Sequence, residues 1–211
     1  MARTRIKVCG ITTAEDALGA VVLGVDALGF NFFKGSSRYI CPEEAAKICR
    51  LLPAFVSSVG LFVNESCEEI NRIVASTKLG LVQFHGDETA GFCESVGYPY
   101  VKALRATNEQ QIEMEAKAYK SAQSILLDTA KNTQFGGTGE VFDWSILPKL
   151  NQPLILAGGL NANNVGAAIA ATNPYAVDVS SGVESSPGQK DYVKMRRFVD
   201  AVFSADRGKN D

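Results

Sequence analysis

The chain has 211 residues, 46% of them apolar and 21% charged, which is typical of one globular domain with a substantial core and excludes a disordered or fibrous chain. The 21 basic and 23 acidic residues leave a net charge of −2, which argues against nucleic acid or an anionic membrane as the main partner. The sequence contains no apolar run near the roughly 20 residues of a membrane span.

Five cysteines stand at positions 9, 41, 49, 67 and 93, an odd number without a C-x-x-C pair. A chain able to build its own core seldom depends on disulfides, and a single histidine gives a Cys/His zinc site little support. We therefore expect reduced thiols and no metal. The basic N-terminal segment lacks the apolar centre of a signal peptide, so we also expect a cytoplasmic protein.

Eight short runs of apolar and β-branched residues alternate with longer amphipathic stretches. The runs predict strands at 5–9, 27–32, 56–63, 81–84, 100–104, 124–128, 154–157 and 176–180. Their mean spacing of about 25 residues is the length that a strand, a helix and two short loops require.

The segments between the strands are predicted to be helices. Their expected starts are Thr12 or Thr13, Pro42, Asn64 to Ser66, Asp87 or Glu88, Thr107 or Asn108, Phe142, Asn161 or Asn163, and Lys190. The short sixth helix is expected around Phe142 to Leu147. The last helix is expected to end at Phe203, before a disordered polar tail from Ser204 to Asp211.

Strict alternation of strand and helix indicates parallel strands joined by crossovers. A closed eight-stranded barrel and an open doubly wound sheet both fit this order. Eight units without a second domain favour the barrel, so we expect an α/β fold, a single-domain (β/α)8 TIM barrel over residues 1–211.

Polar residues recur at the ends of four predicted strands. Active sites of such barrels lie at the C-terminal strand ends, and side chains two residues apart share a face. Ile6 and Val8 are expected to face the helices, which turns the alternating residues inward. The residues expected at the barrel mouth are Lys7, Cys9, Gln83, His85, Asp128, Asp178 and Ser180. This repetition predicts a polar pocket at that rim.

Cys9 has the strongest chemical interpretation among these residues. Lys7 lies two residues away and a helix N-terminus is expected to follow, and both features lower the pKa of a thiol. The other residues also have structural interpretations. Asp128 can cap a loop, Asp178 can orient backbone amides, and His85 can be a hydrogen-bonded structural histidine.

Two glycine-rich turns follow the seventh and eighth predicted strands. Glycines let backbone N–H groups approach a ligand closely, and helix N-termini favour anions. In this fold the seventh and eighth loops often form a phosphate site. We therefore expect phosphate binding by Gly158, Gly159, Ser180, Ser181 and Gly182.

Two further loops carry candidate residues. Arg38, after the second strand, can hold a carboxylate in a bidentate fork or be an ordinary surface arginine. The segment FGGTG at 135–139, after the sixth strand, can be a mobile lid or a plain flexible connector.

Taken together, these segments resemble the phosphoribosylanthranilate isomerase family of tryptophan biosynthesis. The matching motifs are KVCGIT at 7–12, GFNF at 29–32, SRY at 37–39, VGLFVN at 59–64, VQFHG at 82–86, LD at 127–128, GGTG at 136–139, LAGGL at 156–160 and DVSSGVE at 178–184. The first and last motifs are the most specific. The match runs in order over nearly the whole chain.

The resemblance implies a β/α barrel that converts N-(5-phosphoribosyl)anthranilate to 1-(2-carboxyphenylamino)-1-deoxyribulose 5-phosphate by an Amadori rearrangement, without a cofactor. It implies Cys9 as general base, Asp128 as general acid and Arg38 as the ligand of the anthranilate carboxylate. Further substrate contacts are expected from Lys7, Gln83, His85 and Asp178. Ser37 stands where the family is expected to have a proline, which makes the assignment of Arg38 depend on how this loop is held.

The expected partner is a phosphorylated small molecule, and the expected state is a monomer. The main alternative is another phosphate-binding barrel aldose–ketose isomerase, which would not need Cys9, Asp128 and Arg38 together. A thiol redox protein would want a resolving cysteine near Cys9, and the sequence offers none close in position. A barrel that only binds phosphorylated ligands would not need Cys9 and Asp128.

Overall fold

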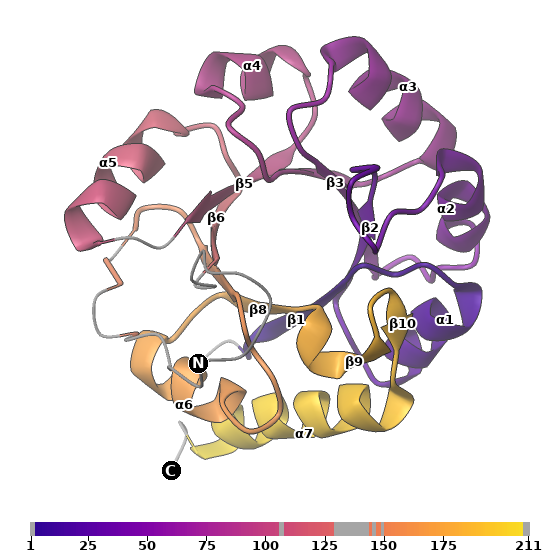
Figure 1. Ribbon diagram of the computed structural model, residues 1–211. Helices are drawn as coiled ribbons and strands as arrows, with labels where there is room; N and C mark the ends of the chain where they lie inside the picture. The colour runs from indigo at the N-terminus through magenta and orange to yellow at the C-terminus, as the bar shows by residue number, and fades with distance from the viewer. Residues whose placement is uncertain (1–2, 106–107, 129–143, 145–146, 149, 209–211) are drawn as a thin grey trace.

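The computed structural model of the chain describes residues 3–105, 108–128, 144, 147–148 and 150–208. Its eight long strands pair in parallel with their neighbours, and β1 pairs with β8 to close a barrel. These strands are β1 (Arg5–Cys9), β2 (Ala27–Asn31), β3 (Ser57–Phe62), β4 (Leu81–Phe84), β5 (Tyr100–Arg105), β6 (Ser124–Asp128), β7 (Leu154–Ala157) and β8 (Ala176–Val179). Figure 1 shows them around a central axis inside a ring of helices. The barrel is therefore confirmed over the open sheet.

The described helices of the ring are α1 (Ala14–Val22), α2 (Pro42–Cys49), α3 (Cys67–Thr77), α4 (Ala90–Ser95), α5 (Glu109–Ala118), α6 (Val165–Thr172) and α7 (Tyr192–Gly208). Four of them begin after a side chain that accepts a hydrogen bond from their first turn: Thr13, Ser66, Thr89 and Asn108. The predicted start of α4 at Asp87 or Glu88 is wrong. Glu88 instead turns inward and accepts hydrogen bonds from the backbone of Asn64 and Gly86.

The last two helices differ from their predicted limits. α6 begins after Asn164, whose side chain accepts a hydrogen bond from the backbone N–H of Asn161. The disordered tail predicted from Ser204 is wrong as far as Gly208, because α7 continues to that residue. Asp206 in its last turns accepts hydrogen bonds from the backbone N–H and hydroxyl of Thr4, each at 2.7 Å, which ties α7 to the start of β1.

Two predicted features lie outside the described residues. They are the glycine-rich segment at 135–139 and most of the short helix expected at 142–147. Beyond the barrel, the 3-10 turn η2 (Ser181–Val183) leads into a small antiparallel hairpin of β9 (Glu184–Ser186) and β10 (Gln189–Lys190). This hairpin contacts the loop after β1, where Thr12 Oγ1 donates a hydrogen bond to the Gly188 carbonyl at 2.6 Å, and the loop after β2, where Arg38 donates to Glu184.

The hydrophobic core has two parts, one on each face of the strands. The larger part lies between strands and helices and includes Ile6 and Val8, as predicted. The smaller part fills the barrel and consists of Val101, Ala103, Leu126, Ile155, Ala157 and Ala176. Asp128 follows Leu126 by two residues, so it lies on the same inner face one step nearer the C-terminal rim. The apolar residues inside the barrel thus lie beneath a layer of polar residues at its C-terminal rim.

An ion pair is buried outside the barrel wall. Lys102 of β5 alternates with the inward-facing Val101 and Ala103, and its ammonium lies 2.9 Å from the Glu88 carboxylate. Each side chain is only 2% exposed. Lys102 also donates a hydrogen bond to the Gly86 carbonyl at 2.6 Å. This pair therefore holds the loop between β4 and α4 against the barrel.

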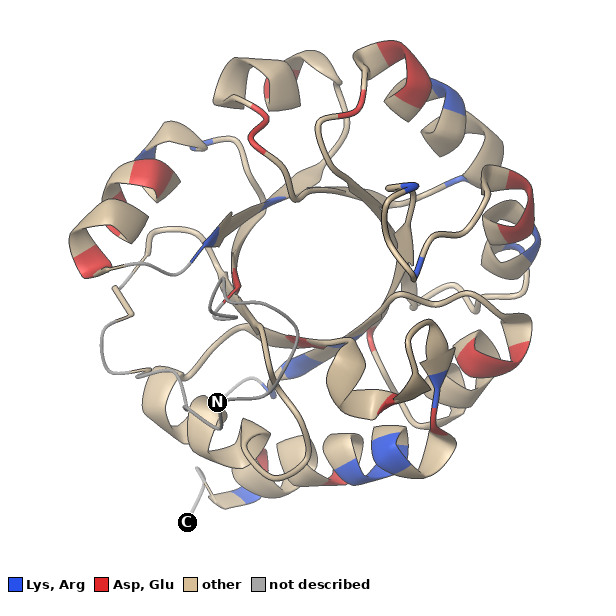
Figure 2. Ribbon diagram, in the orientation of Figure 1, with Lys and Arg blue, Asp and Glu red and all other residues tan. Residues whose placement is uncertain are grey.

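Acidic and basic residues are mixed on the outer helices (Figure 2). No helix in the described part of the chain is both long and apolar enough to cross a membrane. The five cysteines are free thiols; Cys9 and Cys93 are buried, and Cys41, Cys49 and Cys67 are half-buried.

Candidate active site

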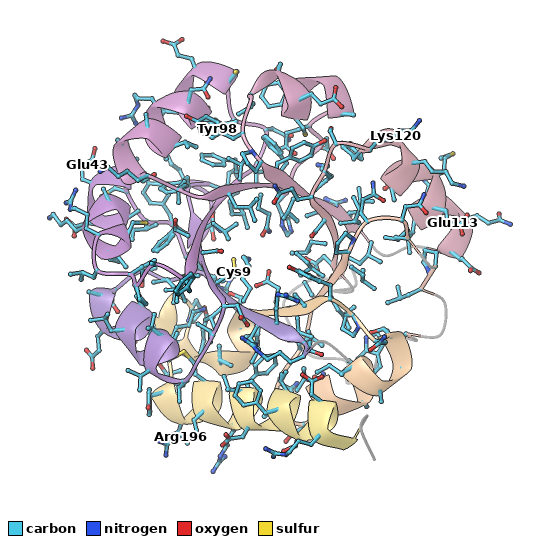
Figure 3. The ribbon with its side chains drawn as sticks, turned by 180° about the vertical axis from the view of Figure 1, so that it is seen from behind. Cys9, Glu43, Tyr98, Glu113, Lys120 and Arg196 are labelled. Atoms are coloured by element: carbon cyan, nitrogen blue, oxygen red, sulfur yellow. The ribbon has the colours of Figure 1, made fainter. Side chains whose placement is uncertain are left out.

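A cavity of about 330 Å³ opens at the C-terminal ends of the strands. Its lining residues are Cys9, Asn31, Arg38, Leu61, Gln83, His85, Asp128, Ala157, Gly158, Gly159, Leu160, Asp178, Ser180 and Ser181. Figure 3 shows Cys9 inside the ring of strands, whereas Glu43, Glu113 and Arg196 lie on the outside of the molecule. The cavity is therefore the polar rim pocket that the strand pattern predicts.

A larger cavity of about 740 Å³ lies near the N-terminal ends of the strands, beside Arg5, Leu154 and Tyr175. Among the described residues that line it, none is a carboxylate, a thiol or an imidazole. Acid–base chemistry requires groups that exchange protons near neutral pH, so the smaller cavity is the better candidate for an active site.

Ten of the twelve predicted site residues line this rim pocket, and the two exceptions are Lys7 and Gly182. Lys7 is buried beneath it, with its ammonium 2.8 Å from Asp178 Oδ2. Gly182 lies where the seventh and eighth loops touch, and a Cβ on it would collide with the Leu160 carbonyl. Both residues support the lining without forming it.

Cys9 lies at the end of β1 and is 8% exposed. Its thiol shares a crowded space with Lys7 over Gly29, where a Cβ would lie 2.7 Å from Sγ and 3.1 Å from the lysine Nζ. Glycine at this position of β2 therefore makes room for the thiol and the ammonium side by side.

The expectation of a lowered thiol pKa is wrong. Burial raises the pKa of the Cys9 thiol, and this effect outweighs the lowering by Lys7. The nearby Asp178 carboxylate adds to the rise, and Lys190 opposes it. Burial also lowers the pKa of Lys7, but the charges of Asp178 and Cys9 raise it overall, so the lysine stays protonated. The two-residue spacing of Lys7 and Cys9 in the sequence does not show how strongly the folded protein excludes water from the thiol.

A second group of three side chains lies across the rim from Cys9. His85 Nε2 is 3.5 Å from Asp128 Oδ2, and Gln83 Nε2 is 2.9 Å from His85 Nδ1. With the amide nitrogen of Gln83 as donor, Nδ1 is an acceptor and the neutral ring carries its proton on Nε2. Gln83 thus turns an N–H of His85 toward the carboxyl group of Asp128.

The backbone of the two glycine-rich loops can approach a ligand closely. Gly158 and Gly159 have φ angles of 87° and 64°, in the left-handed region that favours glycine. Ser180 precedes η2, and its side chain forms no capping hydrogen bond to that turn. An oxygen ligand is therefore not excluded from the start of η2 by a side-chain cap.

Arg38 lines the rim pocket but already holds a carboxylate from its own chain. Its Nε and Nη2 donate to Glu184 Oε1 and Oε2 at 2.8 and 2.7 Å. Lys190 donates to the same carboxylate at 2.7 Å. One edge of the Arg38 guanidinium, predicted to bind a carboxylate of the substrate, is thus occupied by Glu184. The sequence interpretation did not identify Glu184 or Lys190 as site residues. Glu184 ends the DVSSGVE motif, which was the one signal that could have pointed to it.

The loop before Arg38 is held without the expected proline. Ser36 Oγ accepts hydrogen bonds from the Arg38 backbone N–H at 3.1 Å and from Asn31 Nδ2 at 3.0 Å. Asn31 is a lining residue that the sequence interpretation also missed. These bonds order the loop around Ser37, so the substitution does not displace Arg38 from the pocket.

Comparisons with known proteins agree on one family. Residues 6–201 match the family model described as N-(5'phosphoribosyl)anthranilate (PRA) isomerase. The N-(5'-phosphoribosyl)anthranilate isomerase of Pseudomonas fluorescens is 52% identical over 203 residues, which cover 96% of this chain and 100% of that protein. The enzyme of that name from Acidithiobacillus ferrooxidans is 50% identical over 202 residues, covering 96% and 98%.

Solved structures give the same result. The crystal structure of phosphoribosyl anthranilate isomerase from Thermotoga maritima has a TM-score of 0.87 and 41% identity, covering 95% of this chain and 99% of the other. A phosphoribosyl anthranilate isomerase in complex with reduced 1-(o-carboxyphenylamino)-1-deoxyribulose 5-phosphate has a TM-score of 0.84 and 40% identity, with the same coverage.

Proposed function

The chain belongs to the N-(5'-phosphoribosyl)anthranilate isomerase family, and we propose that its rim pocket carries out the family's reaction with Cys9 as general base and Asp128 as general acid. It is an isomerase of tryptophan biosynthesis that converts N-(5-phosphoribosyl)anthranilate to 1-(2-carboxyphenylamino)-1-deoxyribulose 5-phosphate. The observation that carries the assignment of roles is that Cys9, Asp128 and Arg38, from distant parts of the chain, line one cavity.

The reaction begins with a proton delivered to the ribose ring oxygen. Asp128 in its protonated form gives this proton, the bond between C1 and the ring oxygen breaks, and the nitrogen lone pair forms a C=N⁺ bond. The Nε2–H of His85, 3.5 Å away, faces the carboxylate that remains on Asp128. His85 thus stabilises the negative charge that the acid acquires in this step.

The second step removes a proton from C2 of the open-chain intermediate. The thiolate of Cys9 takes this proton, the C–H electrons form a C1=C2 bond, and the C=N⁺ electrons return to nitrogen. The resulting enolamine tautomerises to the ketone as a proton adds to C1 and the proton of the C2 hydroxyl leaves. Every step is a proton transfer with an electron shift inside the substrate, so the chemistry consumes no oxidant or reductant. Lys7 stabilises the thiolate while it exists.

The remaining lining residues bind the substrate. We assign the phosphate to the glycine turn at Gly158 and Gly159 and to Ser180 and Ser181, where backbone N–H groups converge. This is supported by the phosphorylated ligand named for the solved relative. Asp178 Oδ1 is buried and has no hydrogen-bond partner among the residues that the structure describes, so it is suited to accept a hydrogen bond from a sugar hydroxyl.

The free edge of Arg38, which carries Nη1, is assigned to the anthranilate carboxylate. A guanidinium donates five N–H bonds, and the contact with Glu184 uses only Nε and one N–H of Nη2. The opposite edge therefore remains for a second carboxylate. An arginine at 27% side-chain exposure can meet a ligand in the pocket while keeping its internal partner.

The test generates phosphoribosylanthranilate in situ and follows its fluorescence after the protein is added, with Cys9→Ser alongside. Wild type should consume the substrate, and Cys9→Ser should bind the reduced product analogue while losing roughly a hundredfold or more in kcat. A near-wild-type kcat in Cys9→Ser would exclude Cys9 as the base. The same assay with Asp128→Asn tests the acid.

We further propose that the chain acts in the cytoplasm as a monomer. The five free thiols suit a reducing compartment. One solved relative is described as dimeric, so the oligomeric state of this chain needs its own measurement. Light scattering at assay concentration gives it directly, and a mass twice that of the chain would contradict the monomer.

A further inference from the structure

Three charged side chains form a cluster beside the rim pocket. The reaction steps above give a role to only one of them, Arg38. Arg38, Glu184 and Lys190, hereafter the Glu184 triad, share the single carboxylate of Glu184. Glu184 opens the small hairpin and Lys190 closes it, whereas Arg38 comes from the loop after β2. The side chains of Glu184 and Lys190 are 5% and 0% exposed, and that of Arg38 is 27% exposed.

The charge of the triad is not balanced. Burial raises the pKa of Glu184, but Arg38 and Lys190 lower it overall, so the carboxylate is ionised. Burial lowers the pKa of Lys190 overall, although the contact with Glu184 opposes this change. The Lys190 ammonium forms an ion pair with the Glu184 carboxylate at 2.7 Å. Two cations therefore share one anion, and one positive charge is left over. Without Lys190, Glu184 would cancel the charge of Arg38.

Arg38 brings this surplus charge into the cavity, whereas Lys190 reaches the cavity wall only through Ser180, whose carbonyl and hydroxyl oxygens accept from its ammonium at 3.4 and 3.5 Å. Arg38 lines the rim pocket, whereas Glu184 and Lys190 do not. Its stem packs against Gly10, where a Cβ would lie 2.7 Å from the arginine Cδ. Glu184 accepts hydrogen bonds from Nε and Nη2 of Arg38. Within the described residues, Nη1 makes no hydrogen bond. The guanidinium is thus fixed from behind and presents one donor edge forward.

We propose that Glu184 and Lys190 are positioning residues for substrate selection: Glu184 fixes the orientation of Arg38, and Lys190 restores the positive charge with which Arg38 attracts an arylamine carboxylate. The proposal rests on the assignment of Arg38 made above. It gives a reason for burying Lys190 next to Arg38, although Arg38 already has Glu184 as its partner. It also assigns to the hairpin a part in distinguishing anthranilate from an amine that lacks the carboxylate.

The experiment measures dissociation constants for two probes by calorimetry. One probe is reduced 1-(o-carboxyphenylamino)-1-deoxyribulose 5-phosphate, and the other carries aniline in place of anthranilate. Lys190→Met should weaken the carboxylate probe about tenfold, because a unit charge several ångströms away is removed from a poorly hydrated site. The aniline probe should change by less than about threefold. Binding is measured because Lys190 also influences the Cys9 thiol.

The double variant Lys190→Met/Glu184→Gln separates charge from structure. It removes one cation and one anion, so Arg38 again carries a surplus positive charge, and the glutamine oxygen can still accept a hydrogen bond from it. The double variant should therefore bind the carboxylate probe more tightly than Lys190→Met alone. Equal weakening of both probes by Lys190→Met, or no recovery in the double variant, would overturn the proposal and make Lys190 a purely structural residue.

Two further variants keep the outcome interpretable. If Lys190→Met does not fold, Glu184→Gln is compared with the double variant. Glu184→Gln should bind the carboxylate probe more tightly, because it retains the charge of Lys190. Equal affinities would again overturn the proposal. Arg38→Met tests the assignment underneath it: if this variant does not selectively weaken the carboxylate probe, the role given to Arg38 is wrong, whatever Lys190 does.

Discussion

The sharpest structural prediction concerns Gly29 on β2. A methyl group there would lie 2.7 Å from Cys9 Sγ, 3.1 Å from the Cys9 Cα and 3.1 Å from Lys7 Nζ. An ordinary carbon–sulfur contact is about 1 Å longer than the first of these distances, so the thiol has to move by about that amount in Gly29→Ala. Misplacing a reacting group by about 1 Å can reduce turnover about a hundredfold.

The stability of Gly29→Ala should change far less than its activity. Overpacking a tight site costs about 1–3 kcal/mol, which a domain of this size tolerates. The fluorescence assay should therefore show kcat reduced about a hundredfold in a variant that is folded by circular dichroism and still binds the reduced product analogue. Gly91→Ala is the matched control, because a Cβ on Gly91 of α4 meets nothing within 4 Å. A kcat for Gly29→Ala within about threefold of wild type would refute the reasoning that the thiol acts from its present position.

Three other predictions follow from the same geometry. Because burial raises the pKa of Cys9, the rate at which iodoacetamide alkylates this thiol in the substrate-free protein should rise with pH through neutrality, about tenfold per unit, and a plateau below about pH 7 would show the thiol already ionised. Lys102→Met should lower the free energy of unfolding by about 3–5 kcal/mol, because Glu88 loses its buried counter-charge. Urea denaturation measures this free energy, and a loss under about 1 kcal/mol would contradict the prediction. Gly182→Ala should raise KM for the phosphorylated substrate and weaken inhibition by inorganic phosphate, because its Cβ would push the Leu160 carbonyl and separate the two phosphate loops. Unchanged values of both would remove these loops from the phosphate site.

The barrel was predictable because two periodicities coincide in the sequence. The predicted strands and helices alternate eight times, and the inward face of β1 ends on Cys9 as the inward face of β6 ends on Asp128. Alternation at period two then fixes which side chains enter the barrel, without any knowledge of long-range contacts. For this reason Cys9, Asp128 and Asp178 were correctly expected at one rim.

The partners of the site residues were not predictable in the same way. Glu184 lies 146 positions from Arg38, and no local pattern indicates that the hairpin folds back over the loop after β2. The sign of the Cys9 shift was missed for a related reason. Sequence spacing shows that Lys7 is near, but the loss of water around the thiol depends on how the rim closes over it. Desolvation is a property of the assembled barrel, not of one strand.

A base with a raised pKa is consistent with the step assigned to it. The hydrogen at C2 is only moderately acidic even beside a C=N⁺ bond, and a stronger base removes it faster once the base is ionised. The pocket keeps the thiolate scarce but reactive, and it keeps Lys7 protonated next to it so that the charge is stabilised where it forms. The other rim charges are tied to fixed partners: Lys7 to Asp178, and Arg38 and Lys190 to Glu184. Binding groups held rigid in this way are compatible with the proposal that Cys9 and Asp128 are the groups that change protonation during turnover. Removing the Lys7 charge by Lys7→Met should then shift the rise of Cys9 alkylation to higher pH while leaving its slope unchanged.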